Sequence, residues 1–154
     1  MNRHSIISLI GIVVLLVLAS CGADKYYKQG EKYLALGEYY DAANAYKQAY
    51  QKTLPKDRDR RGLIARKMAY CYSKSLQTGK AIAAWRNVER YNKDDSTSHL
   101  TLAQQLMKSG NYKDAEKEFE VALDSMPWSS LAKDGIQSAK NAQHIKQLGS
   151  RYTV

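Results

Sequence analysis

The chain has 154 residues, of which 24 are Lys or Arg and 15 are Asp or Glu, so its formal net charge at neutral pH is +9. This length suits one compact domain with its own core and leaves no room for two. The positive charge favours acidic partners, including anionic lipid heads. A His-Glu-x-x-His motif, a paired Cys-x-x-Cys motif and a Gly-rich phosphate loop are all missing, which argues against the common metal enzymes and nucleotide enzymes.

The first twenty residues have the composition of a secretory signal. Arg3 and His4 precede a mostly apolar run from Ile6 to Leu18. As a helix this run rises roughly 20 Å, whereas the hydrocarbon core of a bilayer is ~30 Å thick. We therefore interpret residues 1–20 as a cleaved signal peptide and not as a membrane-spanning anchor.

Directly after this run, Leu18-Ala19-Ser20-Cys21 resembles the lipobox of bacterial lipoproteins. The resemblance implies cleavage before Cys21, diacylglycerol on its thiol and an acylated amine, with residues 21–24 as a lipidated tether. Several acyl chains, at ~0.8 kcal/mol per buried methylene, hold a protein firmly at a membrane. No cofactor is expected apart from this lipid. Cys71 would then be the one remaining thiol, and we expect it to be a small buried residue.

A pattern of small and large residues recurs three times between residues 25 and 127. Ala69 and Ala103 are one 34-residue period apart, as are Ala81 and Ala115. The first copy contains five extra residues, which we assign to the connection around Pro55. The members of the pattern are Tyr26, Gly30, Tyr33, Gly37, Tyr39, Ala42, Tyr46 and Ala49 in copy one, Ala69, Tyr72, Ala81, Trp85 and Val88 in copy two, and Ala103, Leu106, Gly110, Tyr112, Ala115, Phe119, Ala122 and Pro127 in copy three.

This pattern resembles the tetratricopeptide repeat, a helical hairpin in which small residues allow close helix approach and large residues fill the gaps. The fold expected is all-α, with three tetratricopeptide repeats forming a right-handed α-solenoid. The glycines at 37, 79 and 110 are predicted to lie in the turns inside the hairpins. The charged run Lys56 to Arg61 is interpreted as a solvated loop that leads into a helix. The helices are predicted at Asp24 to Leu36, Tyr39 to Thr53, Arg58 to Leu76, Lys80 to Tyr91, Ser96 to Ser109 and Tyr112 to Asp124.

One further amphipathic helix is predicted over residues 128–148, with Ser129 or Ser130 as its N-cap. Its polar outer face suits a capping helix, because stacked repeats need such an end. The tail, residues 149–154, contains strand-prone residues and is interpreted as the start of a following β domain.

A wider resemblance rests on Ala69-Tyr70-Cys71-Tyr72, Asp134-Gly135-Ile136-Gln137-Ser138 and Ser150-Arg151-Tyr152-Thr153-Val154. These segments are similar to the N-terminal region of large Bacteroidota envelope lipoproteins of the outer-membrane protein A family. In that family a tetratricopeptide module precedes a β-propeller and a peptidoglycan-binding domain, and some members serve type IX secretion. The resemblance implies a position at the outer membrane. Because Gly22-Ala23-Asp24 lacks the acidic run of surface-exported lipoproteins, we expect the domain to face the periplasm.

The concave face, lined in tetratricopeptide proteins mainly by the first helix of each hairpin, is the expected partner site. The lining positions are Tyr27, Glu31 and Leu34 in copy one, Arg66, Tyr70 and Lys74 in copy two, and Leu100, Gln104 and Lys108 in copy three. Relatives with a carboxylate clamp have asparagines where this chain has Glu31 and Tyr70, which argues against capture of a C-terminal carboxylate. The convex face is the alternative site. His99 is expected to pack between repeats or to lie at the surface, with no role as a metal ligand.

The sequence therefore predicts a scaffold with no catalytic residues that binds an envelope protein or an acidic peptide segment. Nucleic acid is not expected as a partner, because most tyrosines occupy packing positions, and peptidoglycan would be bound only through a downstream domain. An adaptor in an outer-membrane assembly linked to secretion is the leading interpretation. The alternatives are a stand-alone lipoprotein that assists barrel insertion or pilus assembly, and an accessory that recruits a cell-wall enzyme.

Overall fold

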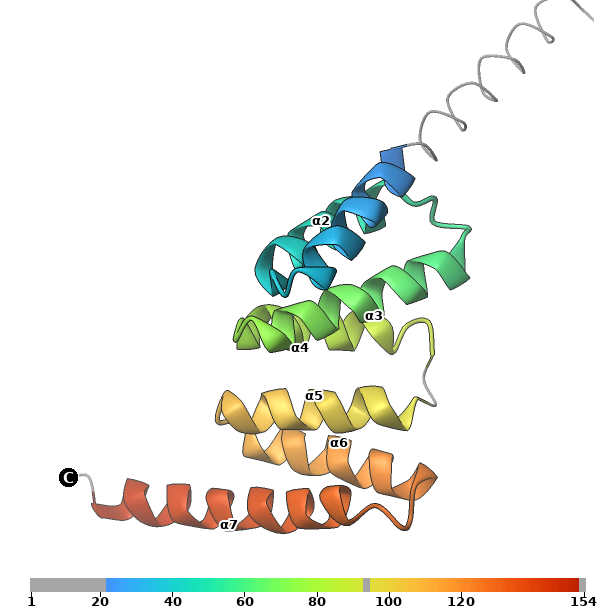
Figure 1. Cartoon of the computed structure of the whole chain (residues 1–154). Helices are drawn as coiled ribbons and strands as arrows, with labels where there is room; N and C mark the ends of the chain where they lie inside the picture. The colour runs from blue at the N-terminus through green and yellow to red at the C-terminus, as the bar shows by residue number, and fades with distance from the viewer. Residues whose placement is uncertain (1–21, 93–94, 153–154) are drawn as a thin grey trace, which may run out of the picture.

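The computed structural model of the chain describes residues 22–92 and 95–152, so the expected signal peptide and Cys21 lie outside the described part. Each helix packs against the next in chain order, and Figure 1 shows the resulting stack of helical layers. No helix in this part of the chain combines the length and apolar character needed to cross a bilayer. The helices are the first helix (residues 22–35), α2 (Tyr39–Lys52), α3 (Arg58–Lys74), α4 (Thr78–Val88), α5 (Ser96–Lys108), α6 (Tyr112–Ser125) and α7 (Ser130–Tyr152).

The core follows the predicted alternation of small and large residues. Gly30 lies against the ring of Tyr46, so close that an added Cβ would come within 2.7 Å of it. At the other end of the stack, a Cβ on Gly135 would come within 2.5 Å of the Phe119 ring. The predicted packing residues Ala42, Tyr46, Ala49, Ala69, Tyr72, Ala81, Trp85, Val88, Ala103, Leu106, Ala115, Phe119 and Ala122 are all buried. Cys71 is buried as well, and burial raises the pKa of its thiol to about 11.

The hairpin turns confirm two of the three predicted glycines and correct the third. Gly37 and Gly110 have φ values of 74° and 76°, in the left-handed region that ends helices without steric cost for glycine. The equivalent residue in the second hairpin is Leu76, with φ 57°, and Gln77 donates its backbone N–H to the Tyr72 carbonyl at 3.0 Å. Gly79 lies inside α4, so its assignment to the turn was wrong. The 34-residue period itself points to residue 76, which is not a glycine.

The last helix is longer than predicted. Ser129 accepts a hydrogen bond from the Ala132 N–H at 3.2 Å, which confirms it as the N-cap. α7 then continues to Tyr152, four residues beyond the predicted end at 148. Residues 149–152 are thus helical and not strand-like, and within this last turn the Ser150 hydroxyl donates to the Gln147 carbonyl at 2.8 Å. Residues 153–154 lie outside the described part.

The charged run is exposed from Lys56 to Asp59 and leads into α3, as predicted, while its last residue makes internal contacts. Arg61, at the end of the charged run, is half-buried and donates to the Thr53 carbonyl at 2.9 Å and to the Tyr91 hydroxyl at 3.1 Å. Its guanidinium lies 4.0 Å from the centroid of the Tyr50 ring. A cation stacked on an aromatic face is stabilising, so Arg61 fastens the start of α3 to α2 and to Tyr91, which follows α4.

We predict that Leu76→Gly stabilises the protein. A side chain in the left-handed region destabilises the fold by about 1–2 kcal/mol. The Leu76 side chain is exposed, so its burial contributes little stability to offset this strain. After the larger chain entropy of glycine is subtracted, a gain of about 0.5–1 kcal/mol is expected, or a few degrees in melting temperature. Thermal circular dichroism measures it. Gly110→Leu, the reverse change at the equivalent turn, should lower the melting temperature, and a fall for both variants would contradict the assignment of strain to Leu76.

Candidate functional site

A hollow of about 610 Å³ opens on the side of the stack formed by α3 and α5. We call it the groove. Residues four apart on a helix share one face, and this spacing places Arg66, Tyr70 and Lys74 on α3 along it. Six of the nine predicted lining residues are brought together here: Leu34, Arg66, Tyr70, Lys74, Gln104 and Lys108.

The other three predicted lining residues do not contribute to this hollow. Tyr27 packs edge to face on Tyr46, with the ring centroids 5.8 Å apart. Glu31 accepts a hydrogen bond from the Tyr46 hydroxyl and pairs with Lys67 at 2.8 Å. Leu100 packs against the core. Internal contacts thus occupy all three side chains, and their role in partner binding stays a prediction.

Six groove residues were not predicted: Lys67, Ser73, Trp85, Thr97, Thr101 and Gln105. A signal for some of them exists in the sequence, because Thr97 and Thr101 are spaced for one helical face with Gln104 and Lys108. Trp85 was assigned to the core alone. Its indole Nε1 donates to the Ser73 hydroxyl at 2.9 Å, a contact between α4 and α3 that no spacing within one helix could indicate.

Arg66 is held by the fold and is not a free positive charge. Its guanidinium pairs with Asp95, the residue before α5, and donates to the Ser98 hydroxyl at 3.3 Å. Ser98 in turn donates to Asp95. Burial would raise the pKa of Asp95, but hydrogen bonds from Ser98 and Arg66, together with the Arg66 charge, outweigh it and hold the pKa below its usual value. This network connects α3 to the start of α5.

Lys67 is also paired, whereas Lys74 and Lys108 are not. The pair that Lys67 forms with Glu31 raises the lysine pKa and lowers the carboxyl pKa, against the opposing effect of burial on each. Lys74 lies 5.6 Å from the centroid of the exposed Tyr70 ring. In the described part of the chain, neither Lys74 nor Lys108 has a carboxylate within 4 Å. The groove is therefore basic at the end formed by these two lysines.

The groove continues towards α7. A second hollow of about 520 Å³ shares Gln104 and Lys108 with it and reaches Phe119, Leu131 and Asp134. Leu131 and Tyr70 are both exposed, so the continuous surface offers aromatic, aliphatic, amide and ammonium groups. Such a surface suits an extended polypeptide better than a compact small molecule.

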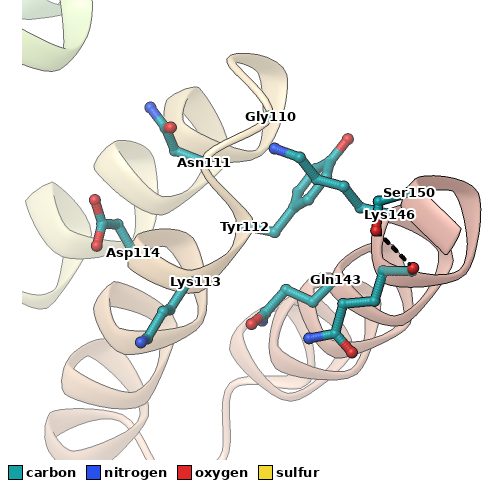
Figure 2. Close-up of a pocket in the computed structure, with 9 residues that line it drawn as sticks. Gly110, Asn111, Tyr112, Lys113, Asp114, Gln143, Lys146 and Ser150 are labelled. Atoms are coloured by element: carbon teal, nitrogen blue, oxygen red, sulfur yellow. Dashed lines mark hydrogen bonds between the residues drawn. The ribbon is translucent and has the colours of Figure 1, made fainter. Parts of the chain in front are cut away.

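A separate hollow of about 420 Å³ lies between the start of α6 and the end of α7. Figure 2 shows its residues, with Lys146 beside the ring of Tyr112. The lysine Nζ is 5.9 Å from that ring centroid, and the Ser150 hydroxyl bonds to a backbone carbonyl. None of its lining residues belongs to the groove. Because Lys146 on α7 contacts Tyr112 on α6, we regard this hollow as part of the helix packing.

Comparison with known proteins identifies the fold. No protein-family model matches the chain, and no curated protein matches it. Among solved structures it is similar to yeast Tom70 (TM-score 0.71, 18% identity, 84% of this chain and 26% of that one). It is also similar to the Sgt2 tetratricopeptide domain from Aspergillus fumigatus (0.63, 22%, 83% of each). A third is the first tetratricopeptide domain of Spaghetti (RPAP3) bound to the HSP90 peptide SRMEEVD (0.65, 17%, 81% and 95%).

These similarities and the stacked hairpins confirm the predicted fold class. Over residues 22–92 and 95–152, the chain is an all-α tetratricopeptide-repeat solenoid of three hairpins followed by one further helix.

We predict that Asp95→Asn removes a pH-dependent part of the stability. A depressed folded pKa stabilises the protein at pH values above the unfolded pKa, near 3.9, and this contribution is lost as the pH falls through the folded pKa. At pH 7 the variant should lose about 1–2 kcal/mol, because Arg66 loses a charged hydrogen-bond partner. Urea unfolding at pH 7 and pH 3 measures it, with exposed Asp124→Asn as the control. A deficit of equal size at both pH values would contradict the assignment.

Proposed function

We propose that this protein is a non-catalytic interaction scaffold whose groove binds an extended acidic segment of another protein. The observation that carries the proposal is that Lys74 and Lys108 line the groove without a carboxylate partner among the described residues, with Lys74 beside the exposed ring of Tyr70. Positive charges without internal partners are available to a ligand, and aromatic side chains are the residues that most often anchor interfaces. A tetratricopeptide fold supports the proposal, since solved examples include RPAP3 with the peptide SRMEEVD and UNC-45 from C. elegans with an Hsp90 peptide.

The ligand that we propose is an internal segment and not a free C-terminus. Lys67 is already neutralised by Glu31 at 2.8 Å, and Arg66 by Asp95. Since both side chains are already paired with carboxylates, they would bind a terminal carboxylate more weakly than two free cations would. Lys74 and Lys108 lie on different helices, α3 and α5, so two acidic side chains along an extended segment can each meet one of them.

We further propose that the scaffold is anchored by lipid on Cys21 in a bacterial outer membrane and faces the periplasm. Support comes from the resemblance of residues 18–21 to a lipobox. In this proposal the scaffold is an adaptor in an envelope assembly, associated with peptidoglycan and with a secretion system similar to type IX. Its ligand is then an acidic segment of another envelope protein.

Charge reversal in the groove tests the proposed binding. Lys74→Glu with Lys108→Glu should reduce partner capture from envelope extracts at least about tenfold, because each charge that becomes buried against an acidic group contributes about 2 kcal/mol. The matched control is Lys47→Glu with Lys117→Glu, two exposed lysines on α2 and α6 outside the groove. Helical circular dichroism should be the same for both variants.

Three results are informative. Loss with the groove pair alone supports the proposal, and binding should then also weaken as salt is raised. Equal loss of partner capture in the groove variant and the control variant would show that capture depends on net charge and not on the groove. Unchanged capture by the groove variant would move the partner site to the convex face.

Replacement of Cys21 tests the anchor. Cys21→Ser should abolish incorporation of labelled palmitate, because both the processing and the acylation implied by the lipobox need the thiol. Cys71→Ser is the control, since that side chain is buried in the core and should not affect labelling. Persistent labelling of the Cys21→Ser protein would contradict the lipid anchor and leave the groove proposal unaffected.

A further inference from the structure

Three potential metal ligands meet where the second hairpin packs on the third. Glu89 follows α4, His99 is on α5 and Glu118 is on α6. Their ligand atoms all lie within 4.8 Å of one another. His99 Nδ1 is 2.7 Å from a Glu118 carboxylate oxygen and 3.7 Å from Glu89 Oε1. No sequence motif joins residues 89, 99 and 118, so this cluster is formed by tertiary structure alone.

The charges of this cluster are incompletely compensated. Glu89 Oε1 is shielded from solvent and accepts no hydrogen bond from the described residues. A buried carboxylate oxygen without a hydrogen bond is costly, and the neighbouring Glu118 adds repulsion. Burial raises the pKa of Glu89, and the Glu118 charge raises it further. The charges of His99 and Arg86 oppose this rise without cancelling it, so the positive charge around the two carboxylates is insufficient.

We propose that Glu89, His99 and Glu118 bind one divalent transition-metal cation, which fastens the second hairpin to the third. One imidazole nitrogen and two carboxylate oxygens are ligands that suit Zn²⁺, and the two negative charges match its charge. With ligands at ~2.0–2.2 Å in a tetrahedral site, neighbouring ligand atoms are roughly 3.3–3.5 Å apart. The Glu89 contact is near this value, and the Glu118 contact must open by a small side-chain rotation.

An ion can reach the site through a hollow of about 450 Å³ that is lined by Arg86, Glu89, Arg90 and His99. A water molecule in this hollow can supply the fourth ligand. The two arginines oppose a cation, although Arg86 lies 3.7 Å from the Asp114 carboxylate, which offsets part of its charge. We therefore expect micromolar affinity, weaker than that of a structural zinc site.

Calorimetric titration of the full chain with Zn²⁺ tests the proposal. All proteins carry Cys21→Ser, so that this thiol does not compete as a ligand. We expect one saturable site per chain and a higher melting temperature with Zn²⁺, which excess chelator reverses. Glu89→Gln keeps the shape of the side chain and should weaken Zn²⁺ binding at least about tenfold. Even substitutions of residues that only hydrogen-bond to a metal ligand typically lower metal affinity by about tenfold or more. Glu118→Gln provides a second ligand variant.

Two control variants separate this site from surface binding. Glu120→Gln removes the same charge at an exposed position of α6, and His144→Ala removes an exposed histidine of α7. Both should bind Zn²⁺ as the parent does. Absence of a saturable site in the parent would overturn the proposal. The three residues would then be a packing contact between the two hairpins without a metal ion. Binding that survives both ligand substitutions, or that His144→Ala abolishes, would also overturn the proposal. None of these results depends on the groove.

Discussion

Close approach of neighbouring helices in this protein depends on a large ring that faces a residue with little or no side chain. Tyr46 lies against Gly30, and Phe119 lies against Gly135, both at distances that leave no room for a Cβ. The buried alanines allow the same approach within the other helix pairs. Since packing density in a core is near that of a crystal, each ring determines how far apart two helices lie.

Some of the positively charged side chains that line the groove form ion pairs within the protein. Arg66 holds the start of α5 through Asp95 and Ser98, and Lys67 holds the first helix through Glu31. Both cations line the groove, yet each stabilises the contact between one hairpin and another element. Lys74 and Lys108 remain for a ligand. The positive charge that this groove presents to a ligand therefore comes mainly from its unpaired lysines, because the ion pairs largely neutralise Arg66 and Lys67.

The junction between α4 and α5 joins the groove to the Glu89, His99 and Glu118 cluster. α5 carries groove residues such as Gln104 and also carries His99, which contacts Glu118 on α6. A change in the spacing of α4 and α5 thus alters both places. Contacts between the second and third hairpins, including the ion pair of Arg66 on α3 with Asp95 before α5, hold the two hairpins together at this junction.

The repeated spacing of small and large residues indicated the helices, their order and much of the core, because helix packing is a periodic constraint that a sequence displays directly. Ile64, Met68 and Leu102 are core residues that this pattern did not name. The usual lining positions of tetratricopeptide repeats, carried over through the resemblance, placed six residues at the groove, and their role in partner binding stays a prediction. Only the tertiary structure decided which groove cations are neutralised and that Glu89, His99 and Glu118 meet. Those features depend on contacts between residues distant in the chain, where spacing within one helix carries no information.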